Sequence, residues 1–494
     1  MENQQMKSKV RKDTAITKTI ALNIWEAFIP VFVLVLMLFF NVFFVYGDNA
    51  LSGSNQFILL LGAAVAALIG FKNKVPYKQM MEEVANNIKS TSGAILILLM
   101  VGALSGTWLI SGIIPSMIYY GLQILNPSIF LAASVVICAI ISIATGSSWT
   151  TSATVGIALI GVGNSLGIAA GMTAGAVLSG AYFGDKMSPL SDTTNLAPAM
   201  AGATLFEHIK YMALTTIPTI GITVLIFSII GFSIPTKGTA DVSDKLQAIE
   251  ATFHISSWLF IVPGIVIFLI LKKTQPLIAL FVGVLLAGII AVIAQPDIVA
   301  NIAGEEKLTF NSAYKGVMNA ITADVAIVTS SAELNDLFTA EGMKGMLGTI
   351  WLIICAMVFG GVMDAIGALS TISSALLSLA SSIFGLFTST VASCLVLNIT
   401  ASDQYLAIVV PGKMFKKAYE DKGLAPENLS RTLEDSGTVT SVLIPWNTCG
   451  AYQSGVLGVG VGEYFIYAIF NWLSPFTTLL FAALNIKIKQ LVKR

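Results

Sequence analysis

The chain has 494 residues, of which 55% are hydrophobic and only 11% are charged, and its formal net charge is zero at pH 7. Its mean hydropathy of +0.83 excludes an ordinary soluble domain, because so few charges could not solvate a protein surface. The zero net charge gives no support to nucleic-acid binding. Repeated apolar runs of about 20 residues predict spanning helices, since the strands of a membrane barrel would alternate. We therefore expect an all-α polytopic membrane protein with about 11–13 membrane segments.

Basic residues predict where the two ends of the chain lie. Residues 1–23 form a polar tail whose basic residues are Lys7, Lys9, Arg11, Lys12 and Lys18. The positive-inside rule places such a tail in the cytoplasm, and the basic tail at 487–494 is expected on the same side. Two leading transmembrane helices are expected within 24–71.

The charges of the loops predict the topology of the remaining chain. The basic stretch at 413–431 is expected in the cytoplasm, as is the turn at Lys272 and Lys273. The linkers at 235–256 and 295–346 carry more acidic than basic residues and are expected outside.

Two long apolar segments, 93–125 and 347–382, fit this topology only if each returns to the side on which it starts. The first is too long for one helix and too short for two full spans, and it contains Gly102, Gly106, Gly112 and Pro115. We therefore expect a pair of short helices there, arranged as a re-entrant hairpin, and a second hairpin at 347–382.

The two halves of the chain share sequence patterns. Thr145-Gly-Ser-Ser-Trp-Thr150 has a counterpart in Asn398-Ile-Thr-Ala-Ser-Asp403, and each follows a long apolar run. The polar stretch at 185–195 has a counterpart at 435–448, where Pro445-Trp-Asn-Thr448 ends the match. These correspondences predict an internal repeat.

The repeat is expected to be inverted. Its first copy, at 72–234, begins after a cytoplasmic loop, and its second copy, at 347–486, begins after an outside loop. The copies therefore run in opposite directions, which is the inverted-repeat plan of secondary transporters. Residues 235–346 are expected to link the copies with further transmembrane helices and outside loops.

The stretch at 180–202 concentrates polar residues between apolar flanks. It holds two aspartates, a lysine, several hydroxyls, an asparagine and two prolines. A charge at bilayer depth costs several kcal/mol, so such residues usually face an interior site. Prolines break helices and free carbonyl groups, and a broken helix with carboxylates is typical of transporter cation sites. The alternative is a polar loop outside the membrane.

Oxygen-bearing side chains at these breaks are the candidate ligands of a small hard cation such as Na⁺. The candidates are Thr150, Asp185, Ser188, Asp192, Thr193, Thr194, Asn195, Asn398, Asp403 and Asn447. The candidate proton-coupling residues are Asp185, Asp192, Asp403 and Asp364. Burial disfavours an ionised carboxylate, so one aspartate could hold H⁺ and Na⁺ in turn.

The two motif pairs give four helix breaks, each with unpaired backbone groups. One central chamber would allow the groups at all four breaks to find hydrogen-bond partners. Thr150, Asp185, Asp192, Asp403 and Asn447 are therefore expected to converge on a common cavity.

Other charged residues leave alternatives open. Lys186 could pair with an aspartate or extend to the membrane interface. Asp364 could carry a second proton, or its carboxylate could find its hydrogen-bond partners at the tip of the expected hairpin. Glu207 and His208 could sense pH or lie at the membrane interface. No hydrolase, zinc-protease or phosphate-loop motif occurs, so we do not expect an enzyme.

Gly184-Asp-Lys-Met-Ser-Pro-Leu-Ser-Asp-Thr-Thr-Asn-Leu-Ala-Pro198 resembles the NhaC family of Na⁺/H⁺ antiporters, within the ion transporter superfamily. The resemblance implies a secondary transporter of the bacterial inner membrane that exchanges Na⁺ for H⁺ and has no resident cofactor. It leaves the oligomeric state open, with a homodimer as one option.

The resemblance leaves the substrate open as well. A branch of the same family exchanges malate for lactate with Na⁺ and H⁺, and other members are amino-acid carriers. The absence of arginine from the apolar segments favours cations alone over an organic anion, with Lys186 as the one basic residue near the site.

Overall fold

The computed structural model describes residues 22–46, 53–124, 126–234, 239–272, 274–335 and 337–491. Lys273 and residues 1–21 of the predicted N-terminal tail lie outside this description. The chain is built from helices, as predicted, and the only strands in the described part are a paired two-residue β1 (Val325–Ala326) and β2 (Thr339–Ala340).

The first part of the chain forms the leading helices and a long third helix. Its elements are α2 (Ile24–Phe40) with the π-helical turn η1 (Asn41–Tyr46), α3 (Ser54–Lys72), α4 (Tyr77–Ile110) and α5 (Ile113–Ile124). The next part carries the polar breaks. Its elements are α6 (Pro127–Thr145), α7 (Ser148–Thr151), the π-helical turn η3 (Ser152–Gly156), α8 (Ile157–Ser165), α9 (Ala170–Met187), α10 (Asp192–Ala201) and α11 (Leu205–Ser233).

The linker holds α12 (Thr239–Thr252), η4 (Ser257–Phe260), α13 (Ile261–Leu271), α14 (Pro276–Ala294), α15 (Pro296–Ala303), α16 (Phe310–Thr322), β1, α17 (Ala332–Asn335), β2 and α18 (Gly342–Gly345). The last part comprises α19 (Leu347–Ala365), α20 (Ala368–Ser378), α21 (Ile383–Thr400), α22 (Gln404–Asp421), α23 (Pro426–Leu433), η5 (Glu434–Thr438), η6 (Ser441–Leu443), α24 (Thr448–Leu457), α25 (Val461–Tyr464) and α26 (Ile469–Ala483).

Helix lengths and composition confirm a multi-pass membrane protein. Among the described residues, eight helices are long and apolar enough to cross a membrane, or nine if the bent pair Ser243–Thr252 and Ser257–Leu271 is one span. The expected total of about 11–13 segments also includes broken helices, and the polar breaks do divide several apolar runs into helices shorter than a span, such as Ala368–Ser378 and Ile469–Ala483.

The segment at 93–125 differs from the expected pair of short helices. α4 has 34 residues, which corresponds to about 50 Å of helix, so it exceeds the ~30 Å hydrocarbon core. It starts in the polar sequence after Pro76 and ends at Ile110, and Gly112, with a positive φ of 80°, then turns the chain into the short α5. α19 and α20 show the same order, with Gly367 at a φ of 77° between them.

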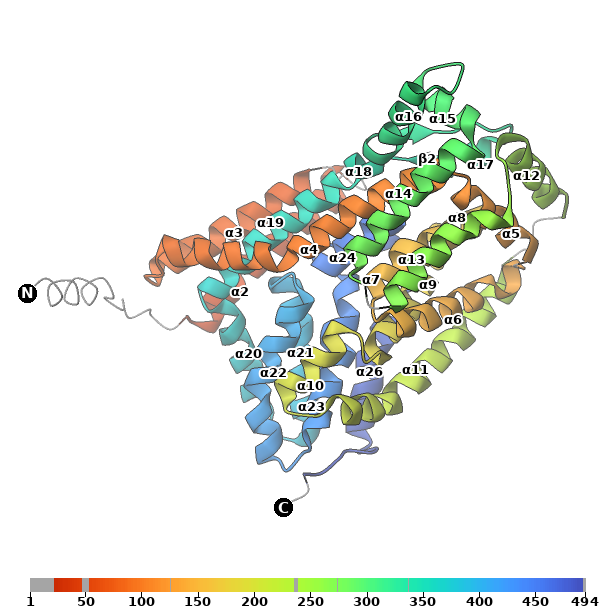
Figure 1. Ribbon diagram of the computed structural model, residues 1–494. Coiled ribbons are helices and arrows are strands. Elements are labelled where there is room, and N and C mark those ends of the chain that lie inside the picture. Colours follow the sequence, from red (N-terminus) through yellow and green to blue (C-terminus); the bar gives the residue numbers. More distant parts are fainter. Residues whose placement is uncertain are drawn as a thin grey trace, which may run out of the picture.

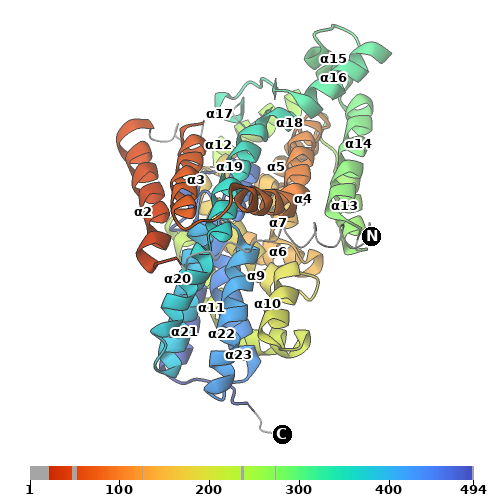
Figure 2. The same ribbon diagram turned by 90° about the vertical axis from the view of Figure 1, so that its left-hand side faces the viewer.

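The linker and the C-terminal end lie at opposite ends of the molecule. Figures 1 and 2 place α15 and α16 at one end and α23 with the C-terminal end of the chain at the other. The 295–346 linker is thus separated by the helical body from the basic α22–α23 region.

Close packing of α9 against α6 fixes the first break. A Cβ atom at Gly180 would lie 2.2 Å from the carbonyl oxygen of Val135, and one at Gly184 would lie 2.4 Å from the Cβ of Ser142. Only glycine allows the two helix backbones to approach this closely. Ser142 also donates a hydrogen bond to the carbonyl of Ala181 at 2.5 Å. The end of α9, where Asp185 lies, is therefore held rigidly beside the end of α6.

Candidate functional site

Four helices begin at the predicted breaks, and each has a polar N-cap whose side chain accepts a backbone hydrogen bond. The caps are Ser147 of α7, Ser191 of α10, Asp403 of α22 and Asn447 of α24. The helix that starts at α7 continues through the π-helical turn η3 to Ser165. N-termini of helices carry unpaired N–H groups and partial positive charge.

A cavity of about 530 Å³ lies among these helix N-termini. Its polar wall includes Thr145, Ser147, Thr150, Asp185, Ser191, Asp192, Thr193, Asp403, Gln404, Tyr405 and Thr448. Four of the five residues expected to converge on one cavity therefore do so. Asn447 does not line the cavity, although its neighbour Thr448 does.

Asp185 is buried in the cavity wall and is surrounded by hydroxyl groups. Its Oδ2 accepts hydrogen bonds from the hydroxyl of Ser148 at 2.6 Å and from the Ser148 backbone N–H at 3.2 Å. Its Oδ1 accepts one from the hydroxyl of Ser191 at 2.5 Å. The Thr193 hydroxyl lies 3.2 Å from that of Ser191. One carboxylate and three hydroxyls thus form a compact set of oxygens.

Ser148 and Ser191 are the contacts that the sequence analysis missed. Both occur inside the predicted break motifs, at the first or capping position of a helix. Serine is common at such positions as an N-cap, so its sequence position alone does not indicate a ligand.

The other two aspartates of the cavity differ in their environment. Asp192 is the first residue of α10 and is exposed at the cavity wall. Asp403 is buried and accepts hydrogen bonds from the backbone N–H groups of Tyr405 at 2.9 Å and Leu406 at 3.0 Å. Asp403 is therefore occupied as a helix cap, whereas Asp192 is open to the cavity.

Several predicted ligands do not line the cavity. Their side chains instead donate hydrogen bonds to backbone carbonyls at the helix breaks. Ser188 donates to the carbonyl of Ile143 at 2.7 Å, and Thr194 donates to the carbonyl of Asp185 at 2.9 Å. Asn195 donates to the carbonyl of Ser191 at 2.7 Å.

The second half of the chain has equivalent hydrogen bonds from side chains to backbone carbonyls at its breaks. Asn398 donates to the carbonyl of Gly437 at 2.8 Å, and Asn447 donates to the carbonyl of Asn398 at 3.0 Å. Asp364 is half-buried in α19 and does not line the cavity either. Trp149 of the first half stacks on Tyr452 of α24 with ring centroids 3.9 Å apart, which joins the two halves beside the cavity.

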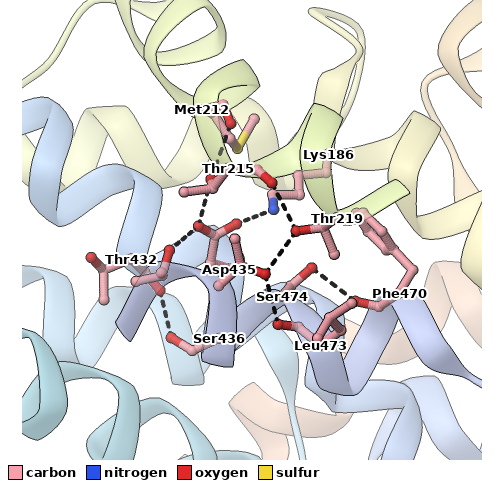
Figure 3. A network of polar contacts seen from close by, with 12 residues as sticks. Lys186, Met212, Thr215, Thr219, Thr432, Asp435, Ser436, Phe470, Leu473 and Ser474 are labelled. Carbon is pink, nitrogen blue, oxygen red and sulfur yellow. Dashed lines mark hydrogen bonds and ion pairs between the residues drawn. The ribbon is translucent and has the colours of Figure 1, made fainter. Parts of the chain in front are cut away.

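Lys186 forms an ion pair with Asp435, and both side chains are fully buried (Figure 3). The second oxygen of Asp435 accepts hydrogen bonds from Thr215 at 3.0 Å and from Thr478. Lys186 therefore does not extend to the membrane interface, and its partner comes from the second half of the chain. Burying two charges is costly unless each is paired, which this cluster achieves.

Two basic groups are buried among helices. Arg431, from the stretch expected in the cytoplasm, is fully buried in α23, with its guanidinium 4.5 Å from the ring centroid of Tyr211. His208 is also fully buried, and its Nδ1 is 2.8 Å from the hydroxyl of Ser430. Packing of α23 against α10, α11, α21 and α22 explains both.

Comparison with known proteins identifies the family. Residues 180–486 match the Na⁺/H⁺ antiporter family. Over 428 residues the chain is 36% identical to the Na⁺/H⁺ antiporter NhaC of Alkalihalophilus pseudofirmus, and the match covers 87% of this chain and 90% of that protein. The chain belongs to the NhaC family of Na⁺/H⁺ antiporters. The family indicated by residues 184–198 is thereby confirmed.

Relatives of this NhaC-family chain have different named substrates. The malate-2H⁺/Na⁺-lactate antiporter of Bacillus subtilis is 37% identical over 423 residues, which cover 85% of this chain and 86% of that protein. The arginine/ornithine antiporter ArcD of Halobacterium salinarum is 33% identical over 425 residues, with coverage of 85% and 84%. All are antiporters by name, so membership of the family indicates a transporter rather than an enzyme.

Proposed function

We propose that this NhaC-family protein is a secondary active antiporter that exchanges Na⁺ for H⁺ across the bacterial inner membrane. The observation that carries the proposal is Asp185, a buried carboxylate bonded to two serine hydroxyls at the wall of a polar cavity. Family membership and the name of the Alkalihalophilus relative support the same ions.

The oxygen set around Asp185 suits a cation and a proton in turn. Without a cation, the hydroxyls of Ser148 and Ser191 donate to the carboxylate. A hydroxyl can rotate its hydrogen away and present a lone pair instead, so the same atoms can coordinate Na⁺. When Na⁺ leaves, burial disfavours the naked charge and the carboxylate takes a proton. Competition at one carboxylate is sufficient for exchange.

Asp192 and Asp403 have supporting roles in this proposal. Asp192 is exposed at the cavity wall, where its charge raises the local concentration of cations. Asp403 faces the cavity from the second half, but its carboxylate already accepts two backbone hydrogen bonds. We therefore assign Na⁺ and H⁺ competition to Asp185 first.

The cavity opens toward the cytoplasm in the proposed orientation. Its wall extends to Ser90 and Thr91 of α4 and to Thr274, Gln275 and Pro276 at the turn between α13 and α14. That turn contains the exposed Lys272, which the positive-inside rule places in the cytoplasm. This orientation also places both termini in the cytoplasm. The conformation in the structure is therefore proposed to be the one that faces the cytoplasm.

The proposal can be tested in proteoliposomes that contain a trapped pH-sensitive dye. Addition of Na⁺ outside is expected to make the lumen alkaline, because inward Na⁺ movement drives H⁺ out. Protein-free liposomes serve as the control. Absence of a Na⁺-dependent pH change would overturn Na⁺/H⁺ exchange.

A second candidate function is exchange of a small organic acid together with Na⁺ and H⁺. The cavity of about 530 Å³ is far larger than one ion needs, since a water molecule occupies only about 30 Å³. Four helix N-termini surround it, and such termini favour carboxylate groups. The names of the malate/lactate and arginine/ornithine relatives favour the same reading.

The same proteoliposome assay distinguishes Na⁺/H⁺ exchange from exchange that also requires an organic acid. If the organic acid is obligatory, Na⁺ alone gives no pH change until malate or lactate is supplied. If Na⁺ and H⁺ suffice, addition of malate or lactate leaves the initial rate unchanged.

A further inference from the structure

The linker helix α16 packs against its neighbours through one narrow face of small residues. That face is formed by Ser312, Gly316 and Ala320, which recur every four residues and are all buried. A Cβ atom at Gly316 would lie 2.3 Å from the carbonyl oxygen of Val299 in α15. One at Gly106 of α4 would lie 1.8 Å from the carbonyl oxygen of Ala320. Backbones can approach so closely only at small residues, so the position of α16 against α4 and α15 is fixed.

The contacts of α16 with α14 place its middle at the depth of the hydrocarbon core. α14 has 19 residues and carries no charge, and its length of about 28 Å nearly fills a core of ~30 Å. A Cβ atom at Gly288 of α14 would lie 3.0 Å from the Cγ1 of Val317 in α16. Gly288 precedes the end of α14 at Ala294 by about 9 Å of helix. The middle of α16 therefore lies beside a spanning helix, although Figure 2 shows its other end beyond α14.

α16 runs into the membrane along its length. Its end at Ala320 contacts Gly106 of α4, and the following chain contacts α4 further from the linker. A Cβ atom at Gly342 would lie 2.8 Å from the backbone nitrogen of Ala323, and one at Gly102 would lie 2.3 Å from the carbonyl oxygen of Gly342. The first residues of α16 are therefore the ones nearest the membrane surface. With 13 residues, or about 20 Å, α16 is too short to cross the core.

The surface of α16 that faces away from the other helices carries an apolar strip and a polar strip. Phe310, Tyr314 and Met318 recur every four residues and are 88%, 64% and 37% exposed. Asn311 and Lys315, each one residue further along, form an exposed polar strip beside them. A helix at a membrane surface has this arrangement, since its apolar side meets acyl chains and its polar side meets water. Aromatic side chains are also enriched at that depth.

We propose that α16 is an interfacial membrane helix whose strip of Phe310, Tyr314 and Met318 binds phospholipid. The lipid belongs to the leaflet on the linker side, which is the outer leaflet in the proposed orientation. A second copy of the chain fits this strip less well, because a standard protein interface has about 20–30 residues a side. Part of the 295–346 linker thus belongs to the membrane, where it anchors the linker ends of α4 and α14. This inference does not depend on which ion or substrate is transported.

Fluorescence quenching tests the proposal in the full-length protein after its four native cysteines have been replaced. Tyr314→Cys and Met318→Cys are each labelled with an environment-sensitive dye and reconstituted in vesicles of phosphatidylcholine and phosphatidylglycerol. A nitroxide on the lipid acyl chain, close to the headgroup, is expected to quench both labels, whereas a water-soluble nitroxide leaves them bright. Lys315→Cys is the matched control on the adjacent polar strip, and its label should show the reverse pattern.

Quenching of the labels at positions 314 and 318 by the water-soluble nitroxide would overturn the proposal. Protection from both quenchers would overturn it as well, since protein would then cover the strip, and an intermolecular disulfide in unlabelled Tyr314→Cys would identify a second copy.

The wild-type protein gives an independent measurement without any substitution. A photoactivatable phospholipid in the vesicles should form covalent adducts within residues 310–318, as on the exposed face of α14, where Ile289 is 58% exposed. Adducts on α14 without any at 310–318 would contradict lipid binding by α16.

Discussion

The hydroxyl of Ser148 lies 2.6 Å from the Oδ2 atom of Asp185, although Ser148 begins α7 and Asp185 lies in the last turn of α9. The contact is possible because α9 packs so closely on α6 that Asp185 reaches the break after Thr145. Ser191 approaches the other oxygen from the next break. Two helix breaks of the first half therefore meet at one carboxylate.

The two serines are expected to set the Na⁺ affinity. Ser148→Ala or Ser191→Ala removes one candidate ligand oxygen and one donor to Asp185. A lost hydrogen bond to a charged group is worth about 1.5–3 kcal/mol, so the KM for Na⁺ should rise at least about tenfold. Na⁺-driven proton flux measured over a range of Na⁺ concentrations gives this value.

Ser134→Ala is the control for these variants, because Ser134 is buried in α6 and donates its hydrogen bond to the carbonyl of Phe130 in its own helix, away from Asp185. Its KM should match the wild type. Wild-type Na⁺ affinity in both Ser148→Ala and Ser191→Ala would show that these hydroxyls do not coordinate Na⁺.

The ion pair between Lys186 and Asp435 is expected to be a structural joint between the two halves. Lys186→Met leaves the charge of Asp435 buried and should destabilise the fold by about 3–5 kcal/mol. Lys186→Met combined with Asp435→Leu should recover most of that loss, because no unpaired charge remains. Thermal unfolding in detergent measures both effects.

Lys72→Met provides the comparison, since Lys72 pairs with Glu26 but its side chain is 71% exposed. Removal of such an exposed pair should cost no more than about 1 kcal/mol. If Lys186→Met were no more destabilising than Lys72→Met, the buried pair would not hold the halves together.

The direction in which the cavity opens can be tested by labelling. After replacement of the four buried cysteines, Cys138, Cys355, Cys394 and Cys449, a cysteine at Thr274 should react with a membrane-impermeant maleimide from the cytoplasmic side only. Accessibility is measured in inside-out and right-side-out vesicles.

Two further positions fix the topology in the same experiment. Asp297→Cys on α15 should react from the outside only, and Lys417→Cys on α22 from the cytoplasm only, because these helices lie at opposite ends of the molecule (Figure 1). Labelling of Lys417→Cys from outside would reverse the proposed orientation.

Polar clusters inside apolar runs predicted the helix breaks well. Gly146 and Ser402 adopt positive φ at two of them, and the N-caps Ser147, Ser191, Asp403 and Asn447 follow from residue type. The convergence of Thr150, Asp185, Asp192 and Asp403 on one cavity also followed, because broken helices at depth need a shared polar environment.

Burial of α23 could not be predicted in the same way. Its sequence, from Pro426 to Leu433, is polar and resembles an exposed loop, yet every residue from Glu427 to Leu433 is buried. Contacts with helices far away in the sequence cause this burial, and hydropathy contains no information about them. For the same reason the sequence did not reveal Arg431 as an interior charge.

The inverted relation of the two repeats remains a prediction. α6 and α21 each end at a break followed by a capped helix, as the matching motifs predict. The order of a long helix, a glycine with positive φ and a short helix also recurs in α4–α5 and α19–α20. These are similarities of local structure, and they do not fix the orientation of one repeat relative to the other.

The most direct test of the central claim is the Na⁺-driven proton flux of Asp185→Asn in proteoliposomes. The variant keeps the size of the side chain but cannot carry the charge for which Na⁺ and H⁺ compete. We predict that the flux falls to that of protein-free liposomes, while Asp297→Asn, which changes an exposed aspartate of α15, retains wild-type flux. A flux in Asp185→Asn near that of the wild type, with the same Na⁺ dependence, would contradict the assignment of Asp185 as the exchange site.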